Sequence, residues 1–116
     1  MPLLKLETSV TLESGKKSAL LVALGEALAK DTGKSPSHVM VVIRDGVELS
    51  MAGKQGPGAF VDVRGIGGLS PGVNRKLSAS VCELLQQQCD IPPAAVFLNF
   101  IELQPSNWGF NGSTFG

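Results

Sequence analysis

The second residue of the chain is a proline, and its type and position allow acid–base chemistry. A small residue after Met1 favours removal of that methionine, which leaves Pro2 with a free secondary amine. Free α-amino groups titrate near ~7.7–8.0, and both burial and a nearby cation such as Lys34 lower the pKa of an amine. An amine whose pKa approaches neutrality is an effective general base. The structural alternative is that Pro2 only begins an edge strand.

Three other places in the sequence could contribute to a functional site. Lys34 follows a glycine in a loop, where a lysine is ordinarily solvated. The glycine-rich segment 65–72 leads into a predicted helix and could present backbone N–H groups to a carboxylate, although it lacks the G-x-G-x-x-G spacing and is equally typical of a flexible turn. Asn99 interrupts an apolar strand and needs a hydrogen-bond partner if it is buried, which neighbouring backbone can also supply. Each signal is weak by itself.

The elements that must position these residues repeat once along the chain. Short strands are predicted at 3–6 and 60–63, and each is followed by a loop, a helical pattern and then a Pro-x-x-Val apolar run. These runs begin at Pro36 and Pro93, so the spacing from strand to run is the same in both halves. Two β-α-β units in tandem explain this pattern.

The chain length suits one domain, residues 1–116, with halves at about 2–56 and 57–116. One helix is expected from 14–17 to about Asp31, and the other from about Pro71 to Cys89. Each has one apolar stripe, so both should cover one face of a sheet. The fold class is α+β, a four-stranded sheet with two helices on one face. Because the run 39–43 is almost wholly apolar, the other face needs cover too, and another copy of the chain is the economical source.

Two Asx-Gly pairs predict short hairpins. Asp45-Gly46 separates the apolar segments 41–43 and 47–49, and Asn111-Gly112 does the same in the C-terminal tail. Such pairs are strong signals for two-residue turns. The resulting strands are too short to be stable alone, so we expect them to pair with sheet edges of neighbouring subunits.

Charge and composition exclude several classes of function. The formal net charge is zero, which argues against nucleic acid and anionic membrane as partners and favours self-association. The N-terminus lacks a signal-peptide pattern and no apolar run reaches the ~20 residues of a membrane span, so we expect a cytoplasmic protein. Cys82 and Cys89 are too far apart on one helix for a disulfide, and a total of one histidine and two cysteines argues against a metal site.

Taken together, the motifs resemble the macrophage migration inhibitory factor family of the tautomerase superfamily over essentially the full chain. They lie at both ends, in two loops, in the second predicted helix and in the last apolar strand: Met1-Pro2, Thr32-Gly33-Lys34-x-Pro36, Ile66-Gly67-Gly68, Asn74-Arg75, Val96-Phe97-Leu98-Asn99-Phe100 and Trp108 to Phe115. The resemblance implies a homotrimer whose three sheets line a central barrel. It also implies active sites between subunits, with Pro2, Lys34 and the Ile66 backbone from one chain and Phe97 and Asn99 from its neighbour.

The activity implied by the resemblance is keto–enol tautomerisation of an aromatic 2-oxo acid such as phenylpyruvate, without a metal or organic cofactor. Pro2 would move the proton, Lys34 would stabilise the developing oxyanion, and Ile66 would add backbone N–H and apolar contact. Three aromatic side chains would form the ring pocket: Phe97, Trp108 and Phe110.

Two departures from the family pattern bear on this expectation. Phe97 stands where better-known members have tyrosine, so one hydroxyl contact to substrate is lost. The segment 58–61 replaces the Cys-x-x-Cys of vertebrate members, so thiol–disulfide exchange is not expected.

Other roles stay open at this stage. The first alternative is a cytokine-like protein that binds a cell-surface receptor after secretion by a non-classical route, with vestigial catalysis. A second is decarboxylation or dehalogenation, which related enzymes carry out with additional charged residues; Arg64 and Arg75 are the candidates here. A purely structural trimer leaves Pro2 and Lys34 unexplained.

Overall fold

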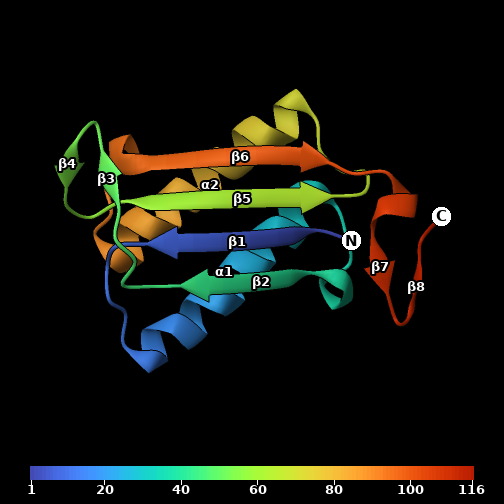
Figure 1. The fold of residues 1–116 in the computed structure, drawn as a ribbon, viewed down its shortest axis with the longest axis horizontal. Helices are drawn as coiled ribbons and strands as arrows, with labels where there is room; N and C mark the ends of the chain where they lie inside the picture. The colour runs from blue at the N-terminus through green and yellow to red at the C-terminus, as the bar shows by residue number, and fades with distance from the viewer.

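The computed structural model describes all residues, 1–116. The elements follow one another as β1 (Leu3–Thr8), α1 (Ser14–Thr32), η1 (Pro36–His38), β2 (Met40–Arg44), β3 (Ser50–Met51), β4 (Lys54–Gln55), β5 (Ala59–Gly65), α2 (Pro71–Cys89), η2 (Pro93–Ala95), β6 (Val96–Glu102), η3 (Pro105–Asn107), β7 (Gly109–Phe110) and β8 (Ser113–Thr114). Four strands form one sheet in the order β2-β1-β5-β6, and both helices lie behind it (Figure 1). The predicted α+β architecture is confirmed.

The strand register confirms the tandem repeat. β1 runs parallel to β2 with Leu3 opposite Met40, and β5 runs parallel to β6 with Phe60 opposite Phe97. The two β-α-β units meet where β1 and β5 pair antiparallel. The helices that connect the parallel strands each contain 19 residues. The two units are therefore alike in connection length as well as in strand pairing.

Both helices begin and end close to their predicted bounds, and local chemistry explains three of the four ends. Ser70 accepts a hydrogen bond from the Val73 N–H at 3.2 Å at the start of α2, and Pro71 occupies the first turn, where no N–H is needed. α1 ends at Gly33, whose φ of 73° is the left-handed conformation that glycine adopts readily. Asp90 ends α2 in the same conformation.

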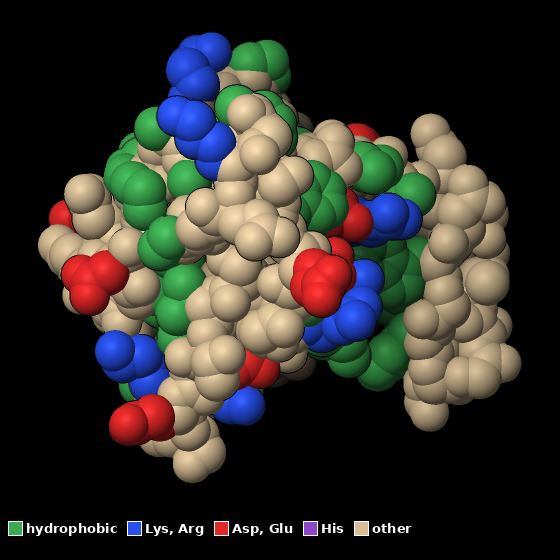
Figure 2. Space-filling model, turned by 60° about the vertical axis from the view of Figure 1, so that its left-hand side comes forward, with side chains coloured by type: hydrophobic (Ala, Val, Ile, Leu, Met, Phe, Trp, Pro, Cys, Tyr) green, Lys and Arg blue, Asp and Glu red, His purple; other side chains and the backbone are tan.

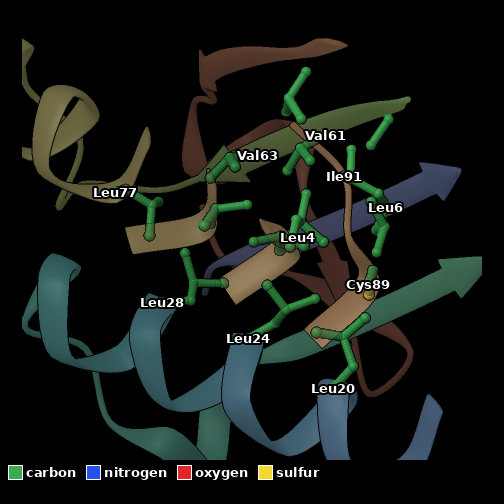
Figure 3. Close-up of a cluster of buried hydrophobic side chains, with 14 of the residues drawn as sticks. Leu4, Leu6, Leu20, Leu24, Leu28, Val61, Val63, Leu77, Cys89 and Ile91 are labelled. Carbon is green, nitrogen blue, oxygen red and sulfur yellow. The ribbon is translucent and has the colours of Figure 1, made fainter. Parts of the chain in front are cut away.

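The core lies between the helices and the sheet. Leu20, Leu24 and Leu28 of α1 point toward the sheet side chains Leu4 and Val63 (Figure 3), and all five are fully buried. The spacing of the three leucines places them on one helical face. Alternate residues of β1 and β5 point inward because side chains alternate between the faces of a strand. Burial of these side chains supplies most of the stabilisation of the single chain.

The opposite face of the sheet exposes apolar side chains in the isolated chain. Met40 is 63% exposed and Phe97 64% exposed, and Val42 and Phe60 also lie exposed. An apolar sheet face left uncovered agrees with the prediction that a further layer must pack against it. Positive and negative side chains are intermixed on the surface in Figure 2, as expected from zero net charge. Neither helix is both long and apolar enough to span a membrane.

One of the two predicted hairpins is wrong. Residues 47–49 form no strand, because the Gly46 N–H donates to the Val10 carbonyl and the Val47 N–H to the Thr8 carbonyl. These bonds carry the chain alongside the end of β1 instead of turning it back on β2. The hairpin forms farther on, between β3 and β4. Asn111-Gly112 does connect an antiparallel pair, β7 and β8, with φ values of 51° and 81°.

Candidate active site at the N-terminus

A cavity of about 580 Å³ opens beside the N-terminus, at the end of the sheet where the C-terminal hairpin also lies (Figure 1). Four segments distant in sequence form its wall: Met1–Leu3, Ser37–Met40, Arg64, and the tail residues Leu103 and Asn107–Phe110. A concave, largely apolar pocket with a few polar groups is the usual form of a small-molecule site. Two predicted aromatic residues, Trp108 and Phe110, line it.

Pro2 is buried in the wall of this cavity, held by the sheet itself. Its carbonyl accepts a hydrogen bond from the Met40 N–H at 3.1 Å, one residue before the parallel pairing of Leu3 with Met40 begins. Parallel pairing puts the start of β1 beside the start of β2. The N-terminal residue is therefore fixed at one end of the sheet instead of being free in solvent.

The N-terminal amine is electrostatically perturbed. Burial lowers the pKa of the Met1 amine, the positive charge of Lys34 lowers it further, and the Glu102 carboxylate opposes both. Desolvation and a neighbouring cation both disfavour the protonated form of an amine. Removal of Met1 would move the free amine to Pro2, which lies deeper in the same environment. Burial and Lys34 thus favour the neutral form of the Met1 amine.

Lys34, in the loop after α1, is near enough for its charge to act on the N-terminal amine. Its side chain lies over the glycine turn at 67–68: a Cβ placed on Gly67 would be 3.3 Å from the Lys34 Nζ, and one on Gly68 would be 2.9 Å from its Cε. Glycine at both positions leaves room for the Lys34 side chain, and a Cβ at position 68 would force it to move. Lys34 does not line the cavity, but its charge acts on the amine beside it.

A polar network lies on the open face of the sheet next to the cavity. The Arg64 Nε and Nη2 both contact one Asp62 carboxylate oxygen at 3.1 Å. The Asn99 amide donates to the other oxygen of the same carboxylate at 3.3 Å. Asn99 therefore finds a side-chain partner and does not depend on neighbouring backbone. Of the two arginine candidates named from sequence, Arg64 lines the cavity and Arg75 does not.

The structure does not bring every predicted residue to the cavity. Ile66 is half-buried just beyond β5 and is absent from the wall. Phe97 lies near the opposite end of the sheet, because Arg64 pairs with Ile101 and Phe97 precedes Ile101 by four residues on β6. At ~3.3 Å per residue this amounts to about 13 Å along the strand. Phe97 is therefore too far along the strand to contact Pro2 of its own chain, and Asn99 does not line the cavity. The role of both residues in a neighbour's site stays a prediction.

Several residues at the site carry no signal in the sequence. Ser37, His38 and Met40 line the cavity because η1 and β2 lie beside the start of β1. The repeat register could have indicated this neighbourhood. Glu102 contacts the glycine turn at 65–68 from the end of β6, and no motif marks it.

Comparison with known proteins identifies the family. The model of the macrophage migration inhibitory factor (MIF) family matches residues 1–116. Macrophage migration inhibitory factor of Xenopus tropicalis is 34% identical over 115 residues, covering 99% of both chains. The homologue from Brugia malayi is 29% identical over the whole of both chains.

Solved structures agree with this assignment. The fold matches the crystal structure of the macrophage migration inhibitory factor-like protein of Entamoeba histolytica with a TM-score of 0.94 at 29% identity, covering 98% of each chain. It matches the homologue from Prochlorococcus marinus with a TM-score of 0.93 at 32% identity, over 98% of this chain and 99% of the other. With sequence and fold matched from end to end, the chain belongs to the macrophage migration inhibitory factor family.

Proposed function

We propose that the protein is a keto–enol tautomerase that acts on an aromatic 2-oxo acid such as phenylpyruvate. The observation that carries the proposal is the N-terminus at the wall of an apolar cavity, where burial and Lys34 lower the pKa of the Met1 amine. Loss of Met1 would place the Pro2 amine in the same cavity wall. Membership of the family supports the same class of activity.

The reaction follows from the groups at the site. With Met1 removed, the neutral Pro2 amine takes a proton from the carbon beside the substrate carbonyl. The resulting Pro2 cation then gives that proton to the carbonyl oxygen, which completes the enol. Lys34 holds the carboxylate or carbonyl oxygen of the bound substrate, so it contributes to KM, and it also stabilises the negative charge that develops on oxygen in the transition state. Trp108 and Phe110 contact the aromatic ring in the cavity. No step consumes a co-reactant, because the substrate proton is only relocated.

In this proposal the active unit is a homotrimer. Apolar side chains on the open sheet face, including Met40 and Phe97, become buried against neighbouring sheets. Phe97 and Asn99 then complete the pocket around a neighbour's Pro2, where Ile66 contributes from the same chain as Pro2. Phenylalanine at 97 offers apolar contact without a hydroxyl, so substrates bound by their ring are favoured.

The test follows phenylpyruvate enol–keto conversion by absorbance, using protein whose loss of Met1 is verified by intact mass. Protein with an N-terminal extension has an amide at Pro2 and should be inactive, and Pro2→Gly should lose most of the activity. Lys34→Ala should lower kcat/KM on the order of 10²-fold, the cost of removing one oxyanion-stabilising group. Lys30→Ala, which removes an exposed lysine at the end of α1, is the matched control and should match wild type.

The result that rejects the proposal is specific. Correctly processed protein that forms trimers yet shows no turnover rules out this substrate class. Turnover that survives the N-terminal extension rules out the amine as the base.

Receptor binding is the second candidate function. The observation that favours it is that the relatives found by sequence are themselves named macrophage migration inhibitory factors. A Pro2→Gly protein that lacks turnover but binds cultured cells as wild type does would favour this role. Binding that requires an intact Pro2 amine would tie the two functions to the same pocket.

A further inference from the structure

The turn at 65–68, which follows β5, is tied to the end of β6 at two points. The Leu103 N–H donates to the Gly65 carbonyl at 2.8 Å, and the Gly67 N–H donates to an oxygen of the Glu102 carboxylate. The first bond continues the β5–β6 pairing by one residue. The second is made by a side chain, so it depends on the identity of residue 102.

This turn is also the surface on which Lys34 lies. Gly67 and Gly68 have φ values of 71° and 82°, and the Lys34 side chain passes within contact distance of both. A lysine side chain has many accessible rotamers, and ordering it beside the amine requires a fixed support. The position of the turn therefore helps to set the position of the Lys34 Nζ.

We propose that Glu102 is a positioning residue of the tautomerase site: by accepting the Gly67 N–H, it fixes the glycine turn that supports Lys34 beside the N-terminal amine. The inference rests on the proposed function. It assigns to Glu102 a role that no sequence motif indicates, since the residue is exposed and lies at the end of a strand.

The Glu102 charge adds a second, separable effect. Two charged groups act on the amine, Lys34 from the loop after α1 and Glu102 from β6. Two further titratable groups line the same cavity: Arg64 of β5, which is paired with Asp62, and His38 of η1. Burial and Lys34 lower the amine pKa, whereas Glu102 raises it. Because the base must be neutral, activity rises with pH through the amine pKa. Removing only the Glu102 charge should therefore move the acidic limb of the rate profile to lower pH.

Two substitutions separate position from charge. Glu102→Gln keeps an oxygen that accepts the Gly67 N–H but loses the charge, whereas Glu102→Ala loses both. We expect Glu102→Gln to keep kcat/KM on the alkaline plateau within about twofold of wild type. Its acidic limb should shift to lower pH, because the carboxylate that raises the amine pKa is gone. Glu102→Ala should show the same shift and a KM raised about tenfold on that plateau, because Lys34 loses its support. Glu26→Ala on the exposed face of α1 is the control and should match wild type.

A readout without turnover keeps the test decisive. Hydrogen exchange at the Gly67 amide should be slow in wild type and Glu102→Gln and fast in Glu102→Ala. Competitive acetylation of the Pro2 amine across pH, followed by peptide mass, reports its pKa in inactive protein as well. A further outcome is that wild-type protein shows no turnover of phenylpyruvate while Glu102→Ala still loses protection of the Gly67 amide. That pair of results would reject the proposed substrate but support the role of Glu102 in fixing the turn.

Three outcomes would overturn the inference. One is an unchanged KM in active Glu102→Ala protein, and another is equal Gly67 exchange in all three proteins. The third is that Glu102→Gln raises KM as much as Glu102→Ala does, because the hydrogen bond that glutamine keeps would then have no effect.

Discussion

Replacing Gly68 with alanine perturbs the Lys34 support directly and allows its cost to be worked from geometry. An added Cβ would lie 2.9 Å from the Lys34 Cε and 3.3 Å from the Thr32 carbonyl oxygen. The lysine tip is flexible and can move away, but the carbonyl belongs to the end of α1 and cannot. The substitution therefore displaces Lys34 and strains the backbone at the same time.

The magnitude comes mainly from the backbone. Gly68 has φ of 82°, and a residue with a Cβ in the left-handed region is destabilised by about 1–2 kcal/mol. We expect Gly68→Ala to lower the free energy of unfolding by about that amount and to raise KM, because Lys34 loses its place beside the amine.

Gly72→Ala is the matched control in the same segment of the chain. Gly72 lies in the first turn of α2, and no atom of the surrounding structure lies within 4 Å of the place that an added methyl group would take. Alanine is favoured over glycine in a helix by about 0.5–1 kcal/mol, so this substitution should stabilise the protein. The same chemical change should thus have opposite signs at two positions four residues apart.

Urea unfolding at one fixed protein concentration and phenylpyruvate kinetics measure the two effects. With a slope of ~1–3 kcal/mol per M, the Gly68→Ala midpoint should fall by roughly 0.5–1 M. A Gly68→Ala protein that unfolds at the wild-type midpoint with an unchanged KM would contradict the described turn. So would a common direction of shift in the two alanine variants.

Two further predictions concern stability. Leu24→Ala, at a fully buried position of the core, should lower the free energy of unfolding by about 2–5 kcal/mol. Leu21→Ala, on the exposed side of α1, should lower it far less. Equal decreases of the calorimetric midpoint in the two variants would contradict the described core. The Asp45 carboxylate accepts the Leu12 N–H at 2.8 Å, and this bond together with Lys17 lowers the carboxyl pKa below its ordinary value. The ionised carboxylate therefore stabilises the fold fully at pH values above its ordinary, unfolded-state pKa. This stabilisation is lost as the pH falls through the lower pKa of the folded state. Asp45→Asn should lower Tm at pH 7. At a pH low enough to protonate the wild-type carboxyl, the two proteins should have nearly the same Tm. A Tm difference that does not change with pH would refute this prediction.

The open sheet face links stability to assembly. Its exposed apolar side chains, Met40 and Phe97 among them, would be buried in the proposed trimer. Burial of apolar surface between chains makes unfolding depend on protein concentration. A comparison of variants is therefore meaningful only at equal concentration, and a shift of Tm with concentration would itself support an oligomer.

Local patterns in the sequence were sufficient to predict the two helices and the repeat. The leucine periodicity in α1, the Ser70-Pro71 start of α2 and the glycine after α1 act through the chemistry of neighbouring residues. The equal spacing of the halves predicted parallel pairing within each unit, which the register of Leu3 with Met40 and Phe60 with Phe97 confirms. Pro2 could be singled out because a free secondary amine depends only on its place in the chain.

Only the tertiary structure decided what surrounds that amine. Arg64 lines the cavity and Ile66 does not, because the register of β5 against β1 determines which residues lie level with Pro2. Glu102 reaches the turn at 65–68 through a bond that joins residues 35 positions apart. The hairpin expected at Asp45-Gly46 does not form, because the N–H groups of Gly46 and Val47 bond to the end of β1 and the segment after it. These long-range bonds override the local turn preference. Local periodicity carries no information about such long-range hydrogen bonds, and they are what place the charges around the base.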